Sequence, residues 1–165
     1  MTHVRLLPAT VAHLVALQSD LSAFGRLIGT AVPDGWPEFP ESIGFTLDRL
    51  RDHPDEGDWW MHFFVSGDAL IGSGGFVGPP QDGVVEIGYE LAPAFRGKGL
   101  GTASAGALIE KARATGTVTK VIANTLAHDN PSTGVLRRLG FGWSRELVDP
   151  EDGPIWRWEL ALTAY

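Results

Sequence analysis

Residues 84–103 read VVEIGYELAPAFRGKGLGTA, and this stretch decides the fold. The apolar and β-branched run at 84–91 predicts a strand, and residues 99–114 predict a helix that Gly116 closes. A further strand is expected over residues 117–124, which are rich in threonine and valine. A strand, a helix and a strand in this order require a parallel, right-handed crossover.

The turn between strand and helix, Arg96-Gly97-Lys98-Gly99-Leu100-Gly101-Thr102, has the composition of an anion site. Alternating glycines let backbone N–H groups approach a ligand without obstruction by a Cβ atom. These groups precede a helix, whose N-terminus favours negative charge, and Arg96 and Lys98 add positive charge. A pyrophosphate is therefore the expected ligand, and a glycine-rich turn with two solvated cations is the alternative.

Two better-known phosphate motifs are excluded by spacing. The dinucleotide-binding fingerprint would need a third glycine at Thr102 or Ser104. The P-loop would need serine or threonine directly after Lys98, where the chain has Gly99.

Upstream of the opening stretch, helical patterns precede strand-like ones. A short strand is predicted at 3–7, and Thr10 can cap a helix whose apolar spacing continues to Ile28, as one helix or as two pieces broken near Ser19. A proline-rich loop at 30–40 leads into a second helix at 41–52. Runs at 59–65 and 69–77, joined by short turns to the strand at 84–91, predict an antiparallel meander.

Downstream, Asn130 can cap a short helix over 131–139, and residues 143–148 and 155–162 predict a terminal hairpin. The chain is thus expected to form one α/β domain over residues 1–165. Its mixed, mostly antiparallel twisted sheet would have about seven strands, with four helices.

Composition limits the class of protein. Acidic residues exceed basic ones by 20 − 13 = 7, which disfavours general binding to nucleic acid or to anionic membranes. The absence of cysteine removes disulfides, thiolate nucleophiles and cysteine-based zinc sites. Neither a secretory signal nor a membrane-spanning run is found, so a cytoplasmic location is expected. The five histidines lack metal-ligand spacing, and no metal is expected.

The glycine turn resembles the Q/R-x-x-G-x-G/A acyl-CoA signature of the GNAT acetyltransferase superfamily. The wider segments GSGGFVGPPQDGVVEIGYELAPAFRGKGLGTA (72–103) and ANTLAHDNPSTGVLRRLGF (123–141) are similar to the branch that includes the ribosomal-protein N-terminal alanine acetyltransferases. The resemblance covers almost the whole chain, because the order of the elements also fits.

This resemblance implies acetyl-CoA as cosubstrate and a V-shaped opening between the fourth and fifth strands. The pantetheine arm would follow the strand edge at Leu91 and Ala92, and the pyrophosphate would meet the backbone of Arg96, Gly97, Lys98, Gly99, Leu100, Gly101 and Thr102. Asn130 and Ser132 would lie near the cofactor thiol, with Ser132 as a possible proton donor. Many family members have a tyrosine in this helix as general acid, whereas this chain has Val135-Leu136-Arg137-Arg138. Protonation of the thiolate by solvent is the alternative.

Attack on a thioester needs a neutral amine, so a base is expected. Glu86 and Glu90 share one face of the strand at 84–91, and Glu86 is the stronger candidate because it lies deeper in the strand. The alternatives are that Glu90 or only water acts as base, or that both carboxylates are merely solvated. The proline loop adds Trp36 as a candidate wall of the acceptor site.

The sequence therefore predicts an N-acetyltransferase that moves an acetyl group from acetyl-CoA to a primary amine in a ternary complex. The acceptor would be a small amine or a protein N-terminus, and a homodimer is possible. The alternative function is a catalytically silent acyl-CoA-binding sensor or regulatory module.

Overall fold

The computed structural model describes residues 3–162. Seven strands form one sheet in the order β1-β2-β3-β4-β5-β7-β6, in which β4 and β5 are parallel and the other neighbours antiparallel. The strands are β1 (Arg5–Pro8), β2 (Met61–Ser66), β3 (Ala69–Phe76), β4 (Val84–Leu91), β5 (Lys120–Leu126), β6 (Gly142–Asp149) and β7 (Gly153–Ala161). The expected meander, parallel crossover and terminal hairpin are confirmed.

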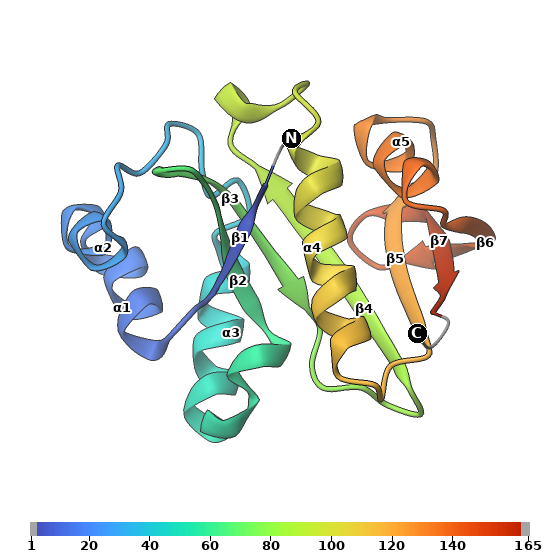
Figure 1. The fold of residues 1–165 in the computed structure, drawn as a ribbon, viewed down its shortest axis with the longest axis horizontal. Helices are drawn as coiled ribbons and strands as arrows, with labels where there is room; N and C mark the ends of the chain where they lie inside the picture. Colours follow the sequence, from blue (N-terminus) through green and yellow to red (C-terminus); the bar gives the residue numbers. More distant parts are fainter. Residues whose placement is uncertain (1–2, 163–165) are drawn as a thin grey trace.

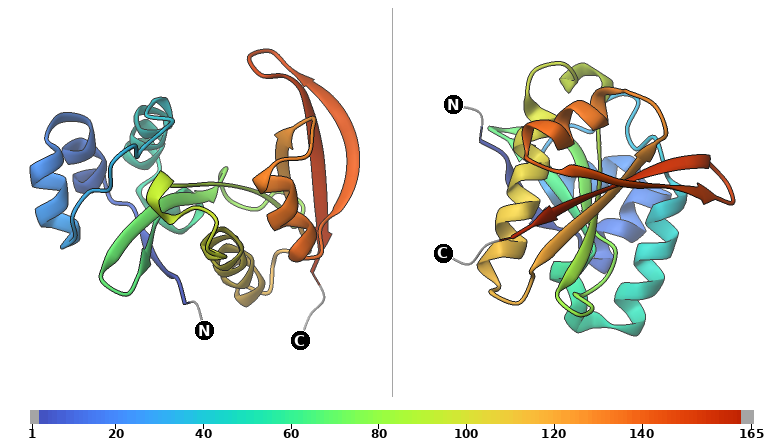
Figure 2. Two further views of the ribbon diagram at one scale, coloured as in Figure 1. Left: turned by 90° about the horizontal axis from the view of Figure 1, so that it is seen from above. Right: turned by 90° about the vertical axis from the view of Figure 1, so that its right-hand side faces the viewer.

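Helices cover both faces of the sheet (Figure 1). They are α1 (Val11–Ser19), α2 (Leu21–Ile28), α3 (Glu41–Asp52), α4 (Leu100–Ala114) and α5 (Pro131–Arg138), with 3₁₀ turns η1 (Pro54–Trp59) and η2 (Pro93–Phe95). Seen from above, α1, α2 and α3 lie on one side of the strands and α4 on the other (Figure 2). The first predicted helical segment is two helices, because the carboxylate of Asp20 accepts hydrogen bonds from the Ser22 and Ala23 N–H groups and starts α2.

Two hydrophobic cores correspond to the two faces. Beneath α4 and α5, residues such as Val85, Ile87 and Val121 of the central strands pack with Leu108 and Leu136. Beneath α1–α3, the second core gathers Leu14, Phe24, Trp36, Leu47 and Phe63. Odd-numbered residues of β4 thus face α4, and the even-numbered ones face the other side.

Glycines in β3 are explained by the close approach of neighbouring backbones. A Cβ atom on Gly74 would lie 2.5 Å from the carbonyl oxygen of Gly88, and one on Gly75 would lie 1.9 Å from that of Trp60. Neither backbone atom can move aside without breaking the sheet, so any side chain here would distort it. These glycines shape the sheet beside the end of β4, where the candidate site lies.

Candidate active site

The central feature of the site is an opening between β4 and β5. Their pairing covers only Val84–Ile87 and Lys120–Ala123, and among the described residues it does not continue beyond them. β4 remains paired with β3 as far as Leu91, and β5 remains paired with β7 as far as Leu126. The two strands therefore diverge, as expected of a V-shaped opening, and the edge of β4 from Gly88 onward is left without a strand partner on that side.

The backbone groups at this open edge follow from the register with β3. The Ala92 N–H donates to the Ile71 carbonyl and the Val77 N–H donates to the Glu86 carbonyl, so even-numbered residues of β4 point their backbone groups toward β3. Tyr89 and Leu91 consequently point theirs into the opening. The Ala92 carbonyl also accepts from the Phe95 N–H, so both backbone groups of Ala92 make hydrogen bonds within the protein. Its cofactor contact stays a prediction, and Tyr89 is a further candidate at the open edge.

The glycine turn lies at the end of β4, directly before α4. Gly97 and Gly99 have φ values of +75° and +79°, which glycine adopts without strain, and a Cβ atom on either would meet nothing within 4 Å. Gly99 is the N-cap of α4 and no side chain caps that helix. Its first N–H groups, in Leu100, Gly101 and Thr102, are therefore available to an anion.

The two cations of the turn differ in their surroundings. Lys98 is exposed at the turn. Arg96 is turned back instead: its Nε donates to the Leu91 carbonyl and its Nη2 to Glu38 Oε2, both at 3.0 Å. The guanidinium thus ties the loop before α3 to the end of β4, and the Arg96 N–H donates to the Pro93 carbonyl at 3.3 Å. The phosphate contact of Arg96 stays a prediction.

Glu90 also holds the loop before α3 in place. Its carboxylate accepts the Glu38 N–H at 2.8 Å and a backbone hydrogen bond from Phe39. Burial raises the pKa of Glu90, and these backbone hydrogen bonds oppose the rise. A carboxylate already used to hold a loop is a poor general base, which favours Glu86 between the two predicted candidates.

Glu86 is half-buried beside the point where β4 and β5 separate. Burial raises the pKa of its carboxyl, while the Arg157 guanidinium and a hydrogen bond with the Asn124 side chain act against this rise. Arg157 Nε donates to Asn124 Oδ1 at 3.3 Å, so the three side chains form one row across β4, β5 and β7. Such an environment keeps a carboxylate near the opening and makes it more basic than a solvated one.

On the other side of the opening stands the N-terminus of α5. Asn130 caps this helix: its Oδ1 accepts the Thr133 N–H at 3.0 Å and its Nδ2 donates to the His128 carbonyl at 3.1 Å. Ser132 is half-buried in the first turn. Asn130 is therefore occupied in fixing the helix start, and Ser132 presents the hydroxyl.

Tyr89 is the neighbour that sequence reasoning missed. Its hydroxyl is buried, makes no hydrogen bond of standard geometry with residues 3–162, and lies beside Ser132. Burial raises the pKa of Tyr89 to about 12, and Ser132 opposes that rise. The alternation of the strand could have indicated this position, since the odd-numbered residues of 84–91 share the face that α4 covers. Its apolar neighbours Ile87 and Leu91 made Tyr89 look like a core residue.

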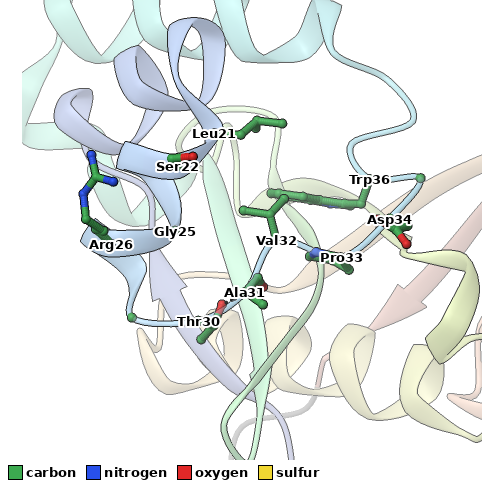
Figure 3. Close-up of a pocket in the computed structure, with 12 residues that line it drawn as sticks. Leu21, Ser22, Gly25, Arg26, Thr30, Ala31, Val32, Pro33, Asp34 and Trp36 are labelled. Carbon is green, nitrogen blue, oxygen red and sulfur yellow. Dashed lines mark hydrogen bonds between the residues drawn. The ribbon is translucent and has the colours of Figure 1, made fainter.

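Trp36, the candidate acceptor wall, is an anchor of the second core. It is 5% exposed, and its Nε1 donates to Ser73 Oγ at 3.0 Å. It also lines a shallow depression of about 770 Å³ between α2 and the loop at 29–36, together with Leu21 and Val32 (Figure 3). This depression is lined only by residues 21–36, and Trp36 is the one residue of the predicted sites among them.

Residues 3–162 contain neither a candidate metal site nor a candidate membrane-spanning helix. No group of three or more histidine, aspartate or glutamate side chains there could hold a metal ion. None of the described helices is long and apolar enough to cross a membrane.

Comparisons with known proteins bear on this geometry. A family model described as an acetyltransferase (GNAT) domain matches residues 4–142. A comparison with curated protein sequences gives no match.

Solved structures share the fold. RimL, a ribosomal L7/L12 alpha-N-protein acetyltransferase in complex with coenzyme A, superposes with a TM-score of 0.71 at 20% identity, covering 98% of this chain and 96% of that one. An acetyl transferase from Salmonella typhimurium that modifies the N-terminal serine of L7/L12 gives 0.70 at 17%, covering 99% and 97%. The microcin C7 self-immunity acetyltransferase MccE, with acetyl-CoA and AMP, gives 0.68 at 17%, covering 97% and 93%.

Proposed function

Because the chain belongs to the family of GNAT acetyltransferase domains, we propose that it transfers the acetyl group of acetyl-CoA to a primary amine by direct attack in a ternary complex. The observation that carries the proposal is the separation of β4 from β5 directly before the uncapped, glycine-lined start of α4. An extended arm can pair with an open strand edge while its pyrophosphate meets the N–H groups of a helix terminus.

The cofactor contacts follow from the free backbone groups. The pantetheine arm would pair with the backbone groups of Tyr89 and with the N–H of Leu91, whose carbonyl already accepts from Arg96 Nε. The pyrophosphate would meet the N–H groups from Gly97 to Thr102. Lys98 would add a solvated charge to the phosphates. Coenzyme A or acetyl-CoA is bound in the related RimL and MccE structures, which supports this choice of cosubstrate.

Glu86 is proposed as the base. It would accept the proton that an ammonium acceptor must lose, directly or through one water, and its raised pKa suits that task. The amine nitrogen then attacks the thioester carbonyl carbon, a C–N bond forms, the C–S bond breaks, and the nitrogen loses its second proton to solvent. The sulfur leaves as a thiolate.

Ser132 is proposed to serve the leaving thiolate. Its hydroxyl would donate a hydrogen bond to the sulfur, with the proton finally supplied by solvent. Tyr89 would act as a positioning residue by hydrogen bonding to Ser132, and its high pKa keeps it a neutral phenol throughout. Asn130 would position Ser132 by capping α5.

Transfer of isotopically labelled acetyl from acetyl-CoA to a panel of amines tests the proposal. We expect labelled amide and one released CoA for each transfer, and a loss of rate without loss of CoA affinity in Glu86→Gln and Ser132→Ala. CoA binding without transfer to any amine would instead favour a silent acyl-CoA-binding module. A protein N-terminus, a polyamine and an amino-acid analogue belong in the panel, because the acceptor is not fixed by fold.

A further inference from the structure

A second depression, of about 280 Å³, lies between the first half of α3 and the ends of β3 and β4. It is lined by Gly88, Tyr89 and Glu90, and so it adjoins the proposed acetyl-transfer site. Gly88 and Glu90 lie on the face of β4 that also carries Glu86. Its walls are mostly aromatic and aliphatic. They include Phe39, Phe45, Trp60, Met61, Phe76 and Val77.

Four polar side chains in these walls, those of Ser42, Thr46, Ser73 and Glu90, already make hydrogen bonds within the protein. Ser42 Oγ donates to the Phe39 carbonyl and Thr46 Oγ1 donates to the Ser42 carbonyl, both at 2.9 Å. Ser73 Oγ accepts from Trp36, and the Glu90 carboxylate accepts from the loop backbone. A polar substituent would gain few hydrogen bonds here and lose those it makes with water, whereas an apolar one would bury surface.

The aromatic wall is held in place from outside. Phe45 and Trp60 meet edge-to-face with ring centroids 5.8 Å apart, and the Arg49 guanidinium stacks 5.3 Å from the first ring and 5.7 Å from the second. Phe45 is nevertheless 52% exposed, as is Phe39. Large apolar surface therefore stays accessible beside the depression in a preformed arrangement.

We propose that this depression selects the acceptor, and that the acceptor is a primary amine that carries an apolar, ring-sized substituent. This inference rests on the proposed function. With the substituent between Phe45 and Val77, the amine would lie over Gly88, where a Cβ atom would meet nothing within 4 Å. Glu86 and Glu90 stand on either side of Gly88 on the same face, and their negative charge complements an ammonium group.

The test compares acceptors of similar basicity. Acetyl transfer to 2-phenylethylamine and to ethanolamine is measured as kcat/KM, and we expect a ratio of at least about 10 in favour of the aromatic amine. Peptides beginning with phenylalanine and with serine form a second pair, which distinguishes a protein N-terminus from a free amine as the source of this chemistry.

In whichever pair the wild type prefers the aromatic acceptor, Phe45→Ala should bring the kcat/KM ratio close to 1 while CoA affinity is retained. Leu27→Ala, which removes a side chain of similar exposure (53%) on α2, is the matched control and should keep the ratio. Two results would overturn the inference and leave the acetyltransferase proposal intact. One is a kcat/KM ratio near 1 for both pairs in the wild type, and the other is a ratio that Phe45→Ala does not change. If no amine is acetylated at all, the proposed function fails and the inference fails with it.

Discussion

Glu86 is the residue whose protonation state should control the pH dependence of the proposed reaction. A raised carboxyl pKa means that the base form is lost at a higher pH than for a solvated glutamate, so the rate should rise as pH increases through that pKa. Glu86→Gln should remove this acidic limb and lower kcat at neutral pH by roughly 100-fold, measured as a pH–rate profile.

Glu159→Gln is the matched control for that experiment. Glu159 lies on the same face in β7 and is paired with Lys120 at 2.9 Å and with Ser144 at 2.8 Å. Loss of the Glu159 carboxylate should leave the acidic limb of the pH–rate profile unchanged. An acidic limb that survives in Glu86→Gln would show that another group, or water alone, removes the proton.

Tyr89 and Ser132 should act as a unit. Removing the phenol hydroxyl in Tyr89→Phe should lower kcat roughly 3- to 10-fold, the worth of one hydrogen bond, without changing CoA affinity. The same substitution in a Ser132→Ala background should have almost no further effect, because the hydroxyl that Tyr89 positions is gone. Strictly additive losses in this double-mutant cycle would contradict the assigned role.

At the scale of elements, the start of α4 carries the phosphate assignment. Gly99→Glu would place a carboxylate and a strained positive φ where an anion must bind, so the Kd for CoA should rise by about 100-fold or more, measured by calorimetry. Gly116→Glu makes the same change at the other end of α4, at a glycine with φ +71° and equally open surroundings. It should share the strain but keep the affinity.

The sequence predicts most elements here because their signals are local. Thr10 and Asn130 both cap helices as expected, each in a capping box with the residue three positions later. Sequence reasoning left open whether a break occurs near Ser19, since the cap that makes it, Asp20, competes with a continuous apolar pattern. Contacts between distant segments, such as Arg96 with Glu38 and Tyr89 with Ser132, leave no such local pattern.

For the whole molecule, buried His62 makes the free energy of unfolding depend on pH. It is 0% exposed, its Nε2 lies 2.7 Å from Lys111 Nζ on α4, and burial lowers its pKa to about 4. As pH falls below about 6.5, this histidine becomes protonated in the unfolded chain but stays neutral in the folded one. The free energy of unfolding therefore decreases from about pH 6.5 toward pH 4. The loss should approach about 3 kcal/mol.

Urea unfolding between pH 7 and 4 measures this effect. His62→Gln should flatten the decline, and the exposed His128→Gln should not. An equally steep decline in His62→Gln would assign the acid sensitivity to the carboxylates instead.

The most direct measurement of the central claim is an experimental structure of the protein with acetyl-CoA. We predict the pyrophosphate against the N–H groups from Gly97 to Thr102, the pantetheine arm paired with the Tyr89 and Leu91 edge, and the sulfur within about 3.5 Å of Ser132 Oγ. A cofactor bound anywhere else, such as in the depression between α2 and Trp36, would contradict the account.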